Sequence, residues 1–342
     1  GYDQIKQPRI TSVFVKMDIY PQSCSFHAEG TYLLVNKTSV FIDTLLIKSG
    51  YDEITEILSD VNLVRISTDS VFQFSVYKLV KAMAPNDSMT LRFRIKNKPN
   101  TLFTQHSNVL RNGSFIKSDI FPKLGYFAET VKPAPSDSNA LGNHYQRIDS
   151  DGIDFEAIVS TSAAQTAIAP GYLQKSWMEK DRRYFHYKMD KKIKFVFGFN
   201  SGEYGVYKEN LNDVDLRIYH HPRHTWCLPQ MMEGLKAALT YNDTNFGRYQ
   251  HRQAQIIEFP RSEGSYATTA ANCIPVSEIR FVNDAGQTKN DNVDISFYVA
   301  AHEVSHQWWG NQVIPADVAG ASMITESVAE YITARVCEKK YG

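Results

Sequence analysis

The residues best suited to chemistry lie in one short stretch, His302-Glu303-Val304-Ser305-His306. On a helix, residues four apart lie on nearly the same face one turn apart, so both imidazoles can reach one metal ion. Neutral histidine nitrogens suit zinc, and the pattern is typical of metallopeptidases. Glu303 is placed to take a proton from a metal-bound water as general base. The alternative is two ordinary histidines on an amphipathic helix.

Two helices must position these groups. The first is expected to begin after Asp294, a good N-cap, and to end at Gly310. A two-histidine site needs a third protein ligand and leaves the fourth position for water. We expect that ligand from Glu326, in the first turn of a helix running from Met323 to about Lys340. Glu330, one turn later, either holds a histidine ring or is a solvated helix charge, and the second interpretation is favoured.

The wider sequence resembles a known family. HEVSHQWWGN followed by ITESVAEY is similar to the zinc site of the aminopeptidase N family of gluzincin metallopeptidases, and the run Gln255–Pro260 also matches. The resemblance implies one Zn²⁺ ion held by His302, His306 and Glu326, with Glu303 as base and a peptide as substrate. It is closest to the variant fused to transporter-permease-like membrane segments in bacteria. That variant implies a soluble, extracytoplasmic, membrane-associated domain linked to spanning segments outside this chain.

The spacing of the third ligand departs from the family. The interval from His306 to Glu326 is one residue longer than the usual eighteen intervening residues. A one-residue shift within a helix would turn Glu326 about 100° away from the metal. The extra residue is therefore expected in the loop Pro315–Gly320.

The segment expected to bind substrate also differs from the family's pattern. The family carries a Gly-x-Met-Glu-Asn strand whose glutamate grips the substrate amine, whereas Gly264–Asn272 contains no carboxylate. We expect Gly264, Ser265, Tyr266 and Ala267 to offer an edge strand to an extended peptide through backbone hydrogen bonds. Selectivity for a free amino terminus should then be relaxed. The family's proton-donating tyrosine lies downstream of the segment that ends at Gly342.

Hydrophobic periodicity indicates a multidomain α+β protein. In residues 1–202, apolar and polar residues alternate, most clearly where Leu91, Phe93 and Ile95 interleave with basic residues. This pattern predicts an N-terminal antiparallel β domain, which the resemblance makes saddle-like. Residues 53–67 are compatible with a helix or a strand, residues 97–151 with a long connection, and 194–199 with a strand. Residues 203–342 are expected to form a thermolysin-like α/β domain.

Composition narrows the function classes. The formal net charge is zero, so nothing indicates a nucleic-acid partner. The longest apolar runs in the sequence are too short to form a membrane-spanning helix. A start at Gly1 and an end at Gly342 favour a piece of a longer protein whose catalytic domain is C-terminally truncated. The four cysteines form no CxxC pair and are expected to be free and buried.

The sequence therefore predicts an aminopeptidase-like zinc metallopeptidase, a hydrolase in which Glu303 activates the zinc-bound water. The alternative is a non-catalytic, zinc-stabilised extracytoplasmic sensing or docking domain of a membrane transporter. The intact Glu303 favours the enzyme, because a structural zinc usually has four protein ligands and needs no base.

Overall fold

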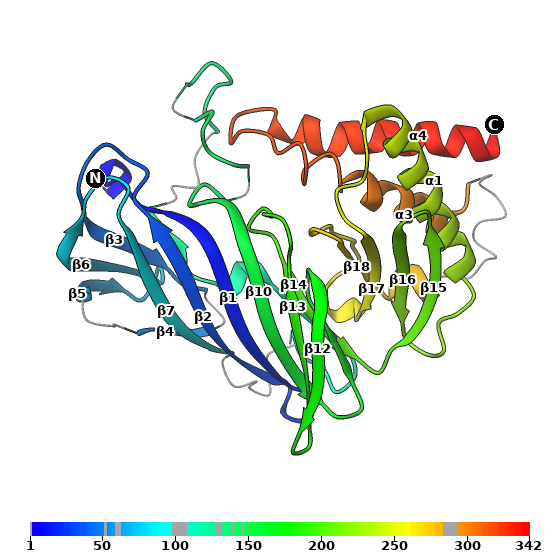
Figure 1. Ribbon diagram of the computed structural model, residues 1–342, viewed down its shortest axis with the longest axis horizontal. Coiled ribbons are helices and arrows are strands. Elements are labelled where there is room, and N and C mark those ends of the chain that lie inside the picture. The colour runs from blue at the N-terminus through cyan, green and yellow to red at the C-terminus, as the bar shows by residue number, and fades with distance from the viewer. Residues whose placement is uncertain are drawn as a thin grey trace.

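The computed structural model describes residues 2–50, 53–58, 63–97, 108–126, 132–138, 140–145, 147–282 and 293–342. It is a multi-sheet, mostly β structure with a group of helices near the C-terminus (Figure 1). The strands up to residue 202 are β1 (Arg9–Tyr20), β2 (Ser25–Val35), β3 (Ile42–Lys48), β4 (Glu53–Leu58), β5 (Leu63–Asp69), β6 (Phe74–Met83), β7 (Ser88–Asn97), β8 (Ser114–Lys117), β9 (Lys123–Leu124), β10 (Ser150–Ser162), β11 (Thr166–Ile168), β12 (Tyr172–Glu179), β13 (Arg182–Lys188) and β14 (Gly198–Gly202). Short 3-10 turns lie at Tyr2–Gln4, Pro21–Ser23 and Ser118–Ile120.

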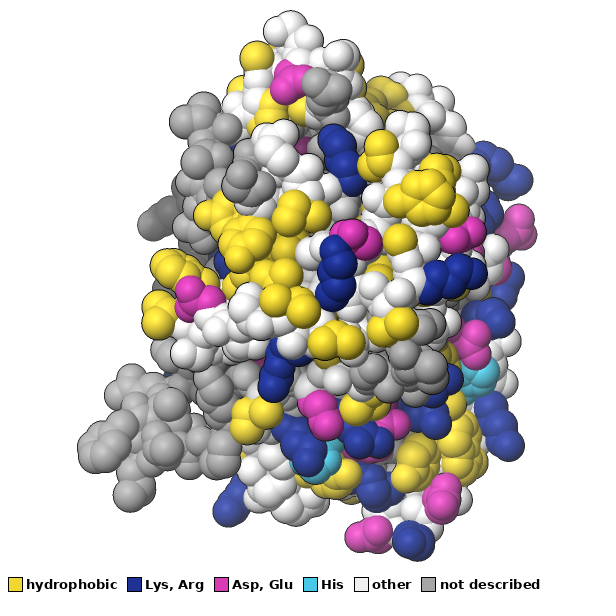
Figure 2. Space-filling model, turned by 90° about the vertical axis from the view of Figure 1, so that its left-hand side faces the viewer, with side chains coloured by type: hydrophobic (Ala, Val, Ile, Leu, Met, Phe, Trp, Pro, Cys, Tyr) yellow, Lys and Arg dark blue, Asp and Glu magenta, His cyan; other side chains and the backbone are white. Residues whose placement is uncertain are grey.

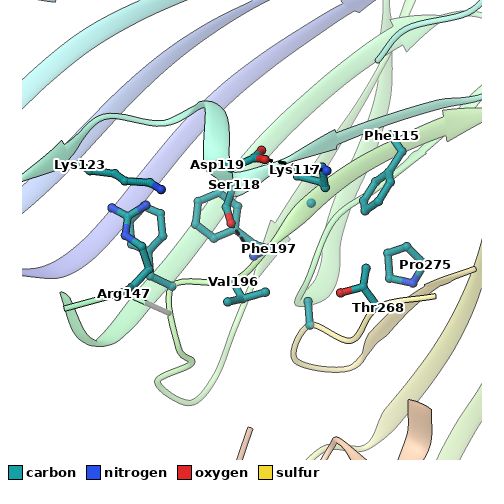
Figure 3. A pocket seen from close by; sticks show the side chains of 13 residues that line it. Phe115, Lys117, Ser118, Asp119, Lys123, Arg147, Val196, Phe197, Thr268 and Pro275 are labelled. Carbon is teal, nitrogen blue, oxygen red and sulfur yellow. Dashed lines mark hydrogen bonds and ion pairs between the residues drawn. The ribbon is translucent and has the colours of Figure 1, made fainter. Parts of the chain in front are cut away.

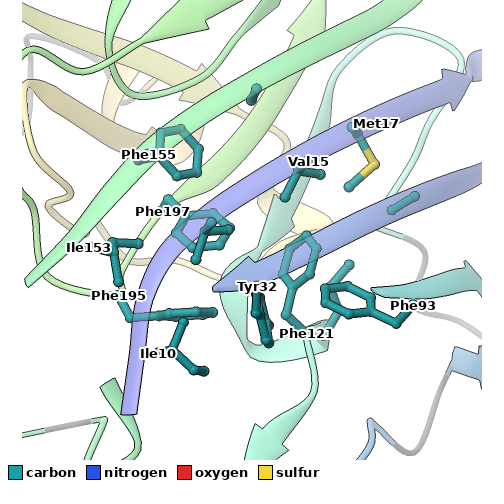
Figure 4. Packing of buried hydrophobic residues seen from close by; sticks show 14 of the residues in the cluster. Ile10, Val15, Met17, Tyr32, Phe93, Phe121, Ile153, Phe155, Phe195 and Phe197 are labelled. Atoms are coloured by element: carbon teal, nitrogen blue, oxygen red, sulfur yellow. The ribbon is translucent and has the colours of Figure 1, made fainter. Parts of the chain in front are cut away.

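These strands form three sheets. The largest has the order β12-β13-β10-β1-β2-β7-β4, the second β5-β6-β3-β9 and the third β11-β14-β8. One apolar face of the large sheet packs on the other two, as the predicted alternation requires: Leu91, Phe93 and Ile95 are fully buried. Aromatic rings fill the space between the sheets (Figure 4), with the Tyr32 and Phe93 ring centres 4.7 Å apart.

Several predictions for this part need correction. The large sheet is not purely antiparallel, because β1 and β10 pair in parallel. The described part of the connection 97–151 contains β8 and β9, and the strand expected at 194–199 begins only at Gly198. The ambiguous segment 53–67 is strand in β4 and β5, with residues 59–62 outside the described residues. Strands this short carry too little periodicity to be detected from sequence.

The C-terminal part is one sheet covered by helices. Strands β15 (Gly205–Leu211), β16 (Val214–His220), β17 (Gln253–Phe259) and β18 (Cys273–Ser277) lie side by side in chain order. The helices are α1 (Leu228–Phe246), α2 (Ile279–Val282), α3 (Ile295–Ser305) and α4 (Val328–Tyr341), with a 3-10 turn at Arg261–Glu263 and a π-helical turn at Met323–Ser327. One face of the sheet packs on α1, α3 and α4 in a common hydrophobic core (Figure 1). The opposite face contacts the N-terminal part, where Ile257 packs with Ile168. Sheet membership changes between Gly202 and Gly205, and we propose the domain boundary there.

Several apolar side chains are exposed at the end of the molecule that holds β5 and β6. Val64 and Ile66 on β5 and Val80 on β6 are exposed, and hydrophobic side chains show among charged ones on this end of the molecule (Figure 2). Within the described ranges, none of the helices has the length and apolar character that crossing a bilayer demands. The four cysteines are free, as expected, and Cys227, Cys273 and Cys337 are buried. Cys24 departs from the expectation, because it is only half-buried.

His251, just before β17, makes stability pH-dependent. Its ring is 4% exposed, packs on Tyr249, and neither ring nitrogen has a hydrogen-bond partner among the described residues. Burial lowers its pKa from 6.5 to about 4. As pH falls from 6.5 towards 4, His251 is protonated in the unfolded chain but stays neutral in the folded chain. The free energy of unfolding therefore decreases over that pH range. The loss amounts to about 3 kcal/mol at most.

We therefore expect His251→Phe to flatten the fall in unfolding free energy between pH 7 and pH 4.5, measured by denaturant titration. Other titrating groups are common to both proteins and cancel in the difference. A parent and variant with parallel pH profiles would contradict the assignment.

Candidate metal centre

Helix α3 presents the two histidines as its sequence predicts. The Asp294 side chain caps it by accepting hydrogen bonds from the backbone N–H of Ser296 at 2.8 Å and of Phe297 at 3.1 Å. The helix ends at Ser305, five residues before the expected stop at Gly310, and His306 is its C-cap with helical dihedral angles. His302 and His306 therefore remain one turn apart, which brings their Nε2 atoms to 3.1 Å.

Glu326 reaches the same point from the π-helical turn Met323–Ser327 that leads into α4. Its Oε2 lies 3.4 Å from the Nε2 of His306 and 3.7 Å from the Nε2 of His302. A π turn closes with one residue more than an α-helical turn. Such a turn can accommodate one extra residue within the helix. The expected place of the extra residue in the loop Pro315–Gly320 therefore stays a prediction.

The spacing of these three atoms fits a zinc ion. Ligands at 2.0–2.1 Å in a tetrahedron lie roughly 3.3 Å from one another, and the three observed separations of 3.1, 3.4 and 3.7 Å bracket that value. In the described residues, this His302, His306 and Glu326 trio is the group of histidine, cysteine and acidic side chains close enough to share a metal.

The ring orientations fit a cation as well. The Nδ1 of His306 lies 3.1 Å from the carbonyl oxygen of Trp309, so Nδ1–H donates and the lone pair of Nε2 points into the site. The Nδ1 of His302 lies 3.0 Å from the Glu330 carboxylate, although not along a well-aligned N–H direction. The same tautomer is favoured there. Two lone pairs facing each other at 3.1 Å repel unless a positive ion lies between them.

Glu330 thus lies closer to the site than the favoured interpretation of a solvated charge implies. Its side chain is 56% exposed, yet it contacts the ring of His302 and accepts a hydrogen bond from the hydroxyl of Tyr298. A carboxylate behind a metal-binding histidine fixes the tautomer and orientation of the ring.

Glu303 lies beside the trio but belongs to the buried side of α3. It is 7% exposed, and the Thr269 hydroxyl donates a 2.7 Å hydrogen bond to its Oε2. Burial raises the pKa of this carboxyl, against the opposing effect of His306 and of the Thr269 hydrogen bond. A carboxylate with a raised pKa is a stronger proton acceptor than an exposed one.

The segment Gly264–Asn272 forms an irregular extension of the sheet at the free edge of β18, with isolated bridges at Ala267 and Ala270. The Thr268 N–H donates to Pro275 and the Ala270 N–H to Cys273. Of the predicted substrate contacts, Gly264 binds the Ser277 hydroxyl through its carbonyl and Tyr266 packs on Phe259. The residue of this segment that contacts Glu303 is Thr269. It lies in the predicted segment but was not among the four residues expected to contact substrate.

Lys194 is a second residue near the metal centre, after Thr269, that no sequence pattern singled out. It comes from the N-terminal part, and a Cβ added at Gly310 would lie 3.8 Å from its Nζ. Burial lowers its pKa to about 8, against the attraction of Glu326. The Lys194 ammonium group thus lies near Gly310 and within electrostatic reach of Glu326.

Comparison with known proteins matches this architecture. The chain is similar to an M1 zinc metallopeptidase from Deinococcus radiodurans, with a TM-score of 0.64 at 12% identity over 98% of this chain and 72% of that one. A variant of that enzyme bound to a Tyr-Ser-Ala substrate gives a TM-score of 0.63 at 12% identity with the same coverage. No protein-family profile matches the chain, and no curated protein matches it in sequence. The chain therefore has the two-domain M1 metallopeptidase fold.

Proposed function

We propose that this chain is the zinc-binding part of a peptidase that hydrolyses peptide bonds. The observation that carries the proposal is the convergence of His302, His306 and Glu326 beside the buried carboxylate of Glu303. The fold shared with M1 zinc metallopeptidases supports it.

In this proposal different residues bind the metal, transfer the proton and position the base. Zinc bound by the trio would polarise a scissile carbonyl and lower the pKa of a nearby water molecule. Glu303 takes the proton of the attacking water and passes it to the leaving amine nitrogen. Thr269 holds the Glu303 carboxylate in place through its 2.7 Å hydrogen bond. Glu326 lies on the open side, with a side chain 63% exposed, so a substrate can approach from there.

The edge segment supplies a docking strand for the peptide. The N–H groups of Thr268 and Ala270 are used by β18, so the backbone groups of Ala267 and Thr269 point to the free edge. A peptide added there would gain backbone hydrogen bonds in the manner of strand addition. Because Gly264–Asn272 offers no carboxylate to an amine, we propose that blocked and free peptides are both accepted.

The test pairs metal analysis with hydrolysis. We expect one zinc per chain and cleavage of amino-blocked peptides at a kcat/KM within about tenfold of the free ones, since no charged anchor of about 1.4 kcal/mol or more favours the amine. Cleavage should stop on chelation and return with zinc. One zinc without cleavage of either peptide would instead favour the non-catalytic docking domain linked to membrane segments. No zinc would refute both.

A further inference from the structure

A cavity of about 230 Å³ lies between the N-terminal sheets and the edge segment of the catalytic sheet (Figure 3). The N-terminal part contributes residues of β8, β9 and the chain before β14, and the C-terminal part contributes Thr268, Ala270 and Pro275.

The charged groups that line this cavity are mostly cations. Lys117, Lys123 and Arg147 face it, with Asp119 as the single acid among its lining residues. Figure 3 shows the Lys123 ammonium and the Arg147 guanidinium directed towards each other at one end, with Thr268 and Pro275 at the other. Two cations brought together around an open space repel unless an anion joins them.

Existing partners neutralise only part of this charge. Arg147 is 7% exposed and is held by Asp149, which accepts bonds of 2.7 Å from Nε and 2.9 Å from Nη2. Lys117 lies 3.8 Å from Asp119 at the rim. Lys123 has no carboxylate within 4.0 Å in the part of the chain that the structure describes. Burial lowers the pKa of Lys123, and the neighbouring Arg147 lowers it further.

Two chain segments connect this cavity to the metal centre. In the edge segment, Thr269 contacts Glu303, whereas its neighbours Thr268 and Ala270 line the cavity. In the segment before β14, Lys194 lies near Gly310 and interacts electrostatically with Glu326, whereas Phe195 and Val196 line the cavity. The cavity and the metal centre are therefore bordered by adjacent residues of the same two segments.

We propose that this cavity receives an acidic side chain, aspartate or glutamate, of the peptide substrate, with Lys123 as its principal cationic contact. The inference rests on the proposed peptidase function and names its substrate class. A peptide paired with the free edge of the segment directs alternate side chains to the two faces of the sheet. One face leads to Glu303 and the other to the cavity, so a side chain next to the reacting residue can enter the cavity beside Thr268 and extend towards Lys123 at its far end.

Other lining groups complete the recognition. The Ser118 hydroxyl accepts the Phe197 N–H at 3.4 Å and keeps its own hydrogen for a carboxylate. The Arg147 guanidinium lies flat on the Phe195 ring, 3.7 Å from its centre, and is fixed in place. A charge-assisted contact made in such a half-buried space outweighs one on the surface.

The test uses a series of amino-blocked polyalanine peptides, each with a single glutamate at a different position. Matching peptides carry glutamine, the uncharged isostere, at the same position. We expect one position at which glutamate raises kcat/KM at least about tenfold over glutamine, as a single charged hydrogen bond does. Lys123→Met should remove that advantage, and Lys123→Glu should transfer it to lysine at the same position. Lys175→Met is the matched control, because this exposed lysine of β12 lies outside the cavity and should leave the ratio unchanged.

Thermal unfolding and zinc content of each variant verify that it is folded. Cleavage of glutamate and glutamine peptides at equal rates at every position, or a preference that survives Lys123→Met, would overturn the cavity assignment and leave the peptidase function standing. If no peptide is cleaved, calorimetric binding of the same peptides to the zinc-loaded protein replaces the rate. A Lys123-dependent preference for glutamate in binding would then support the cavity while the peptidase function fails, and equal binding would overturn the cavity too.

Discussion

Glu303→Gln should lower kcat/KM for peptide hydrolysis by about 10²- to 10⁴-fold, the usual contribution of a general base, while one zinc per chain is retained. Glutamine fills the same buried space and can still bind the Thr269 hydroxyl, but it has no carboxylate to take a proton from water. The measurement is kcat/KM on one blocked peptide, together with zinc content by atomic emission.

The matched control for this variant is Glu278→Gln. Glu278 lies just after β18 and is 3.5 Å from Arg261, away from the trio, so its replacement should leave turnover within about twofold. Undiminished turnover in Glu303→Gln would eliminate the general-base role. Loss of zinc along with activity would show that Glu303 organises the metal centre instead.

Glu326→Gln should reduce zinc affinity by more than about 100-fold, beyond the 10- to 100-fold typical of losing a residue that only supports a ligand. The two histidines remain, but the third atom of the trio loses its negative charge. Affinity is measured by competition with a chelator. The stabilisation that zinc confers, about 2.7 kcal/mol at 100 times the dissociation constant, should disappear from the unfolding curve at the same zinc concentration.

Glu330→Gln provides the comparison within the same helix. Its carboxylate contacts His302 from behind, so its loss should weaken zinc binding by roughly tenfold and leave the stoichiometry at one. Equal effects of the two substitutions would assign them equal roles. Zinc binding by Glu326→Gln at the parent's affinity would mean that the third ligand is another group.

Local patterns in the sequence predicted the helix that carries the histidines and the strands of the N-terminal part. The Asp294 cap, the helix carrying both histidines and the alternation along β7 depend on neighbours a few residues apart, and the structure confirms these features. Glu326 was expected near the histidines because a two-histidine site needs a third protein ligand, and the family resemblance supported that choice. Its position in space could not be derived, because two helices separated by a loop have no fixed geometry in sequence alone. The ligand roles themselves remain predictions.

Long-range contacts explain what was missed. The parallel pairing of β1 with β10 joins strands that are far apart in the chain, and no periodicity encodes it. Lys123 and Lys194 approach the C-terminal sheet and its helices from strands and loops of the N-terminal part, where each is one lysine among many in the sequence. Thr269 is visible only after β18 fixes the direction of the edge segment.

The π turn at Met323–Ser327 affects how this type of site can change during evolution. Because the turn takes up one residue before α4 resumes its regular winding, the register of Glu326 is set from its C-terminal side. An ancestor could therefore gain or lose a residue upstream of the glutamate without dismantling the metal centre. The same geometry is therefore compatible with more than one spacing between the histidine pair and the downstream acid, and a search pattern that fixes the spacing would overlook proteins that share the geometry.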